Sequence, residues 1–188
     1  MLSGNPLLRQ KDLRVHVDDP YALEVFTDYF TKLLGETYTS SPIIVLCIGT
    51  DRSTGDSLGP LVGEKLKKTC RQAKVLGNLE EPVHAGNLGK VLDEIRKLYN
   101  NPFIIAVDAS LGRSENVGTI KLARGAIKPG AGVNKDLPAV GDFHITGIVN
   151  VGGFMEYFVL QNTRLYVVMK MVDIISAGIL NGLKVFFK

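Results

Sequence analysis

The sequence predicts an α/β fold in which helices cover both faces of a mostly parallel sheet, a three-layer α/β/α sandwich. Apolar segments of strand length alternate along the chain with amphipathic segments of helix length. The strand-like segments are continuous apolar runs, which is typical of parallel strands that are buried on both faces. Strands and helices that alternate in this way place a ligand crevice beyond the carboxyl ends of the strands.

The chain length fits one domain. Its 188 residues, 45% hydrophobic and 22% charged, have the composition of a globular protein. Residues 1–20 show no clear period, so we expect an N-terminal extension that is loose or draped over the domain, and we assign no role to His16. A single domain is expected over residues 21–188.

Composition disfavours several classes of protein. No apolar run approaches the roughly 18 residues that cross a membrane, and the N-terminus lacks the apolar stretch of a secretory signal. The 22 basic and 19 acidic residues are scattered, without the basic stripe of a nucleic-acid surface. Cys47 and Cys70 alone support no disulfide framework. We therefore expect a cytoplasmic protein with neither a membrane nor a nucleic acid as its partner.

Two strand and helix pairs are predicted after a first helix. That helix begins at Tyr21 and ends near Gly35. The β-branched run at 43–48 is expected to be a central strand, and residues 58–70 a helix whose lysines suit its carboxyl end. A short strand at 75–79 and an amphipathic helix at 87–99, which Asn87 caps, complete this part of the chain.

The second half of the chain gives a less regular pattern. A strand at 103–107 ends at Asp108, and a strand at 118–123 is expected to pair antiparallel at one edge of the sheet. Residues 145–160 are expected to be helical, followed by a strand at 165–169 and a closing helix at 172–187. The Gly/Pro-rich segment 125–142 is long for a compact domain and favours a lid or a substrate-binding loop.

Three features reach the carboxyl edge of the sheet if these elements are right. They are the loop 49–56 with Asp56, the strand-ending Asp108, and His144. Two carboxylates in a partly dry crevice repel each other, so one holds a proton and acts as acid while the other acts as base on water. Alternatively, a divalent metal ion lies between Asp56 and Asp108, with His144 completing the ligand set.

Structural roles compete with these assignments. Asp56 precedes a helix and would suit the cap of its free N–H groups, Asp108 would suit an Asx turn, and His144 would suit a structural hydrogen bond. His84 is a second candidate for the crevice. The glycines around Asp56 match no phosphate-binding spacing, and no G-x-S-x-G serine elbow is present.

Three islands of sequence resemble a known family. Asp56-Ser57-Leu58-Gly59-Pro60, then Asp108-Ala109, then Pro129-Gly130-Ala131-Gly132-Val133-Asn134-Lys135 follow one another in that order. In them the chain resembles the YyaC-type sporulation proteins, relatives of the spore germination protease, from about Pro42 to the C-terminus.

The resemblance implies a function for each island. By similarity to the germination protease, Asp56 and Asp108 would be the catalytic carboxylates, and Gly130, Gly132, Asn134 and Lys135 would hold a peptide. The hydrogenase-maturation peptidases, which share this general fold, place two acidic residues and a histidine around a nickel ion, positions similar to Asp56, Asp108 and His144.

Two functions follow as expectations. The first is a sporulation-associated peptidase of aspartic or metal-assisted type, acting on a peptide or protein in the cytoplasm of a spore-forming cell or in the spore interior. The second is a non-catalytic sporulation protein that uses the same crevice to bind a peptide or a small ligand. The chain is much shorter than the germination protease, which favours the second.

Overall fold

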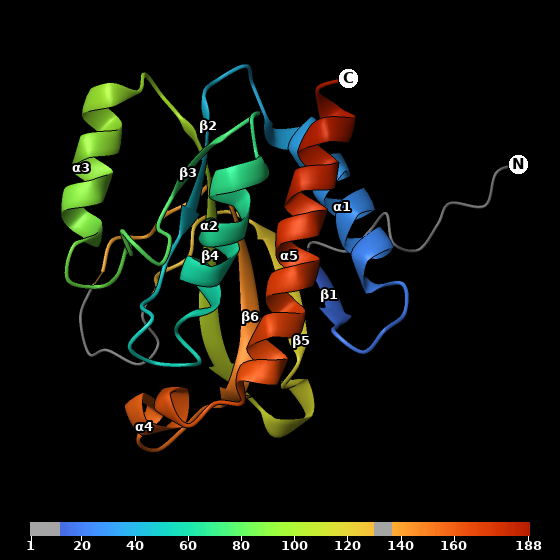
Figure 1. Ribbon diagram of the computed structural model, residues 1–188. Helices are drawn as coiled ribbons and strands as arrows, with labels where there is room; N and C mark the ends of the chain where they lie inside the picture. Colours follow the sequence, from blue (N-terminus) through green and yellow to red (C-terminus); the bar gives the residue numbers. More distant parts are fainter. Residues whose placement is uncertain (1–11, 130–136) are drawn as a thin grey trace, which may run out of the picture.

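The computed structural model describes residues 12–129 and 137–188 as a single six-stranded sheet flanked by helices (Figure 1). Its elements are, in chain order, β1 (Asp12–His16), α1 (Ala22–Thr37), β2 (Ile43–Cys47), α2 (Leu58–Thr69), β3 (Lys74–Leu76), α3 (Leu88–Leu98), β4 (Phe103–Gly112), β5 (Thr119–Arg124), β6 (Phe143–Val151), α4 (Glu156–Gln161) and α5 (Leu165–Phe186). A short 3₁₀ turn at Ser114–Asn116 joins β4 to β5.

The sheet is mixed, with the strand order β1-β5-β6-β4-β2-β3. Strands β3, β2, β4 and β6 run parallel, whereas β5 pairs antiparallel with β6 and β1 pairs antiparallel with β5. The parallel part explains the continuous apolar runs, because every residue of β2 is buried. The α/β sandwich predicted from the sequence is confirmed.

Two apolar cores lie on opposite faces of the sheet. Alternate residues of β2 point to opposite faces, so Val45 belongs to the core under α1, α2 and α5, and Leu46 to the core under α3. Helix α5 packs between α1 and α2 in front of the sheet, while α3 lies apart from them (Figure 1). The fold therefore has three layers, and its parallel strands end at the edge that carries α4.

Helix α5 is the one helix in the described part of the chain that is long and apolar enough to cross a membrane, by length and composition alone. Here it contributes buried residues to the core and packs closely on α1. Cβ atoms added at Gly178 and Gly182 would lie 2.2 Å and 2.4 Å from ring carbons of Phe26 and Phe30. Glycine at these two positions lets the two helices approach each other.

Several predicted elements are wrong. Residues 143–151 form strand β6, whose burial alternates residue by residue, and a helix over 145–160 is therefore wrong except at α4. Residues 165–186 form the single helix α5, where we expected a strand and then a helix. Gly35 does not end α1, which continues to Thr37. In each case helical and strand patterns in short apolar segments are hard to distinguish, and tertiary packing decides between them.

The N-terminal extension and the outer strand also differ from expectation. Asp12–His16 is an edge strand, in which Leu13 and Val15 are buried and Arg14 between them is exposed. Strand β5 consequently lies inside the sheet and not at its edge. His16 fixes this edge, since its Nε2 donates to the carbonyl oxygen of Val117 at 3.0 Å.

Candidate functional site

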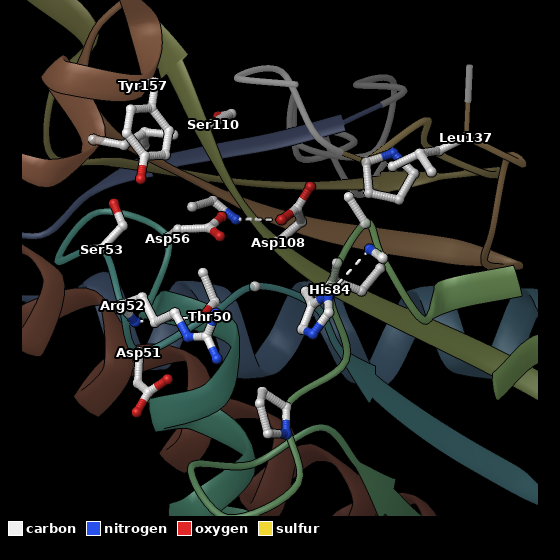
Figure 2. Close-up of a pocket in the computed structure, with 18 of the residues that line it drawn as sticks. Thr50, Asp51, Arg52, Ser53, Asp56, His84, Asp108, Ser110, Leu137 and Tyr157 are labelled. Carbon is white, nitrogen blue, oxygen red and sulfur yellow. Dashed lines mark hydrogen bonds between the residues drawn. The ribbon is translucent and has the colours of Figure 1, made fainter. Parts of the chain in front are cut away.

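A cavity of about 370 Å³ opens at the carboxyl ends of the parallel strands (Figure 2). Its walls come from the loop after β2, the loop after β3, the last residues of β4, and helix α4. The residues that line it are Ile48, Gly49, Thr50, Asp51, Arg52, Ser53, Asp56, Pro82, His84, Ala85, Gly86, Asp108, Ala109, Ser110, Leu111, Pro129, Leu137, Tyr157 and Leu160. Asp56 and Asp108 therefore line the same cavity, and their side chains are directed into it (Figure 2).

The loop between β2 and α2 folds back on itself tightly. The Thr50 N–H donates to the carbonyl oxygen of Asp56 at 3.2 Å. Gly49 has a φ of 139°, and a Cβ on it would lie 2.0 Å from that same Asp56 oxygen. Only glycine fits here, because it tolerates this φ and leaves room for the returning chain. Gly49 thus sets the position of Asp56.

The carboxyl group of Asp56 is partly buried, and burial raises its pKa above the ordinary value of 3.8. A hydrogen bond from the Thr50 main chain and the nearby His84 act in the opposite direction, and burial has the larger effect. No side chain caps the amino end of α2. Asp56 therefore does not have the capping role that the sequence allowed. A carboxyl group that resists ionisation suits a proton donor.

Asp108 lies within β4 and not after it. Val107 pairs with Cys47, the last residue of β2, so Asp108 is the first residue of β4 beyond the end of its neighbour. Its side chain is buried, with 5% exposure, and one carboxyl oxygen accepts a 2.9 Å hydrogen bond from the Ala109 N–H. Strand β4 continues to Gly112 alongside β6, so the predicted strand end at Val107 is wrong and Asp108 closes no turn.

His84 comes from the loop after β3 and lines the cavity. The side chain of Asn87 holds this loop, accepting from the His84 N–H at 2.8 Å and donating to the Pro82 carbonyl at 2.9 Å. Asn87 makes no side-chain cap on α3, contrary to our expectation. The Gly86 N–H donates to His84 Nδ1 at 3.0 Å, so the neutral imidazole carries its proton on Nε2.

His144 lies elsewhere. It is the second residue of β6, opposite Ala106, near the amino end of that strand. Its Nδ1 donates to the Gly125 carbonyl oxygen at 2.9 Å, and burial lowers its pKa. His144 does not line the cavity, and no group of three or more His, Cys, Asp or Glu side chains in residues 12–129 and 137–188 could hold a metal ion. Its predicted place before a helix at the carboxyl edge is wrong.

The predicted peptide-holding residues Gly130, Gly132, Asn134 and Lys135 lie outside the described residues. The two residues on either side of that segment, Pro129 and Leu137, line the cavity. The described ends of the Gly/Pro-rich segment therefore both lie at the cavity.

Helix α4 forms a wall that was not predicted. Tyr157 and Leu160 line the cavity, and the Gly55 N–H donates to the Leu160 carbonyl oxygen at 2.8 Å. Ser53, beside Asp56, also lines the cavity and was not singled out from the sequence. The alternating apolar positions from Phe143 to Val149 would have revealed β6, and with it the short helix that follows.

Two comparisons with known proteins concern the sequence. The family model described as "Protein of unknown function (DUF1256)" matches residues 14–178. The chain is 54% identical over 172 residues to "Uncharacterized protein YyaC" of Bacillus subtilis (strain 168), which covers 91% of this chain and 83% of that protein.

A solved structure has a similar fold. It is the crystal structure of a [NiFe] hydrogenase maturation protease, HycI, from Thermococcus kodakarensis KOD1. The two structures align with a TM-score of 0.50 and 18% sequence identity, over 81% of this chain and 99% of the other. At this identity the likeness concerns the fold alone.

Proposed function

The chain belongs to the DUF1256 family, and from the geometry of its cavity we propose that it hydrolyses peptide bonds with Asp56 and Asp108 as an acid and base pair. The observation that carries the proposal is that one aspartate in the loop after β2 and one within β4 line the same cavity, and that burial raises the pKa of Asp56. Active sites often hold carboxyl groups in partly dry clefts that shift their pKa.

Each carboxyl group then has a role. Asp108 accepts a proton from a water molecule as the water oxygen attacks the carbonyl carbon of the bound peptide. Asp56, which resists ionisation, donates its proton to the nitrogen of the leaving amine as the carbon–nitrogen bond breaks. Proton transfers of this kind contribute about 10²- to 10⁴-fold each to rate.

A nickel ion held by two acidic residues and His144, as in the hydrogenase-maturation peptidases, is not part of the proposal. The Nδ1 of His144 binds the Gly125 carbonyl, and the residue lies outside the cavity. The described residues do not fit that ligand set.

Peptide cleavage tests the proposal. Wild-type protein would be incubated with a library of acetylated and amidated peptides, and new termini would be counted by mass spectrometry. We expect Asp56→Asn and Asp108→Asn to lose at least about 100-fold in cleavage rate. The control is Asp93→Asn, an exposed carboxylate on α3 that pairs only with Arg96 among the described residues, and it should cleave like wild type. Full cleavage by both aspartate variants would refute the proposal.

Binding without cleavage is the second candidate function. The Ala109 N–H already occupies one oxygen of Asp108, an arrangement that suits a structural carboxylate as well as a base. Wild-type protein that binds library peptides but releases no new termini would establish this alternative.

We further infer from the resemblance to sporulation proteins that the natural peptide or protein ligand lies in the cytoplasm of spore-forming cells. The identity of 54% with YyaC of Bacillus subtilis supports testing this in that organism. A fluorescent fusion of YyaC should accumulate in the cytoplasm during sporulation. Equal fluorescence in growing cells, or fluorescence at the membrane, would contradict this setting.

A further inference from the structure

Ser53 is buried against the cavity without a hydrogen-bond partner. The residue is 7% exposed and lines the cavity, and its Oγ is the one buried side-chain polar atom in residues 12–129 and 137–188 that has no partner. A hydroxyl removed from water without a replacement partner is unfavourable for the folded chain. Such groups are few in native proteins, and a catalytic role, strain, or a bound water or ligand accounts for them.

Ser57 gives a direct comparison within the same loop. It is 6% exposed, and its Oγ donates to the Thr54 carbonyl oxygen at 2.7 Å. Ser57 does not line the cavity. The two serines are buried to nearly the same extent and lie four positions apart. The Ser53 hydroxyl, at the cavity, has no hydrogen-bond partner, whereas the Ser57 hydroxyl has one.

The unpaired hydroxyl lies beside Asp56. The Ser57 N–H donates to the Ser53 carbonyl oxygen at 3.0 Å, so the chain makes one helix-like turn between them. Residues three apart on such a turn lie on the same side, which places Ser53 next to Asp56. Figure 2 shows both side chains on the cavity side of the loop.

Tyr157 approaches from the opposite wall. Its ring extends from α4 with the hydroxyl directed into the cavity, toward the part where the Ser53 hydroxyl lies (Figure 2). The hydrogen bond from the Gly55 N–H to the Leu160 carbonyl oxygen holds α4 against the Ser53 loop. The two hydroxyls are thus carried by parts of the chain that are fixed relative to each other.

The charges around the cavity limit the ligand group that these hydroxyls bind. Asp51, Asp56 and Asp108 line it, with Arg52 as the opposing cation at an exposed position, so an anionic group is disfavoured. A neutral acceptor matches two hydroxyl donors and the neighbouring carboxyl pair. The main-chain carbonyl oxygen of a peptide is such an acceptor.

We propose that Ser53 and Tyr157 form a recognition subsite in which their hydroxyls donate hydrogen bonds to a main-chain carbonyl oxygen of a bound peptide. The proposal rests on the proposed function for the identity of the ligand as a peptide. Ser53 is here a binding and positioning residue, which orients the amide group that lies over Asp56 and Asp108.

N-methylacetamide, which is one isolated peptide bond, is the probe. It would be titrated into ¹⁵N-labelled protein, and the backbone amide signals of residues 49–57 and 157–161 would be followed by NMR. We expect saturable shifts in wild type, weakened about two- to tenfold in Ser53→Ala and Tyr157→Phe, the range of one hydrogen bond. Ser57→Ala is the control and should bind the probe like wild type.

Thermal unfolding of the same variants separates a binding role from a structural one. Ser53→Ala removes an unpaired buried hydroxyl and should raise the Tm by about 2–4 °C, whereas Ser57→Ala loses a satisfied bond and should lower it. Unchanged probe binding in both Ser53→Ala and Tyr157→Phe would overturn the subsite. So would a wild type that does not bind the probe, or a Ser53→Ala protein that loses stability as Ser57→Ala does, because water would then satisfy the hydroxyl.

The outcomes also separate this subsite from the hydrolase proposal. If wild type cleaves no peptide while probe binding requires Ser53, the hydrolase proposal fails and the subsite stands. If Asp56→Asn abolishes cleavage while Ser53→Ala and Tyr157→Phe both bind the probe like wild type, the subsite fails and the hydrolase proposal stands.

Discussion

The main-chain N–H of Gly55 donates a 2.8 Å hydrogen bond to the carbonyl oxygen of Leu160, which holds the loop that carries Asp56 directly against α4. A Cβ on Gly55 would lie 2.8 Å from both Leu160 Cδ2 and Thr163 Oγ1. The contact joins two walls of the cavity that are more than 100 residues apart in sequence. The distance between these walls therefore depends on the absence of a side chain at one position.

Gly55→Ala should push α4 away from this loop. We expect a lower Tm and weaker binding of N-methylacetamide, because a methyl group does not fit between the two segments. Gly89→Ala is the matched control, since a Cβ at Gly89 on α3 meets nothing within 4 Å. If Gly55→Ala binds the probe as tightly as wild type does, this prediction is wrong, and α4 moves without changing the binding site.

Asp56→Asn should stabilise the folded chain at neutral pH. Burial raises the folded-state pKa of Asp56 above the 3.8 of an unfolded chain. The stability associated with this carboxyl is then fully present below about pH 3.8 and is lost as pH rises through the folded-state pKa. An amide carries no charge at any of these pH values, so the variant avoids the loss.

Unfolding curves from about pH 3 to pH 7 measure this effect. The Tm of Asp56→Asn should exceed that of wild type at pH 7, and the difference should shrink toward pH 3. Asp93→Asn is the matched control, because it removes an exposed carboxylate on α3. An Asp56→Asn protein that is less stable than wild type at pH 7 would mean that the ionised carboxyl is stabilised in the folded state.

His144→Asn should leave peptide cleavage unchanged, and so should a chelator such as EDTA. The His144 ring donates a hydrogen bond to the Gly125 carbonyl oxygen, and an asparagine amide offers a donor for the same bond. Cleavage assays on the variant and on chelator-treated wild type check both points. Cleavage that is lost on chelation and restored by a divalent cation would instead show that a metal ion takes part.

Gly178→Ala should destabilise the packing of α5 on α1 by about 1–3 kcal/mol, the usual cost of overpacking. The added Cβ would lie 2.2 Å from a ring carbon of Phe26, a fully buried side chain. Gly89→Ala should do the opposite and stabilise by up to about 1 kcal/mol, because alanine favours a helix and meets no neighbour there. Urea unfolding of the two variants gives both values, and equal effects would contradict the packing described.

The parallel part of the fold is predictable from the sequence for a physical reason. A strand such as β2 is buried on both faces, and a continuous apolar run of this length is typical of a buried parallel strand. The same reasoning placed Asp56 and Asp108 at one edge of the sheet, because parallel strands deliver their following residues to a common side. The structure does bring both residues to one cavity.

Strand β6 was mistaken for a helix although its apolar residues alternate, and the role of its glycine can be explained only from the packing. A Cβ at Gly147 would lie 2.6 Å from Leu58 Cδ2 and 2.7 Å from Met171 Sδ, so the helices above the sheet require glycine there. Ser53 and Tyr157 were missed because nothing local distinguishes them. Their relation depends on α4 meeting the loop after β2, which is a long-range contact.

Asp56 and Asp108 line one cavity, and we propose that each alters the proton affinity of the other. Carboxyl ¹³C shifts across a pH titration give the pKa of Asp56 in wild type and in Asp108→Asn. We predict a lower pKa for Asp56 in the variant, because loss of a neighbouring negative charge makes ionisation easier. A pKa for Asp56 that is the same in both proteins would contradict the account.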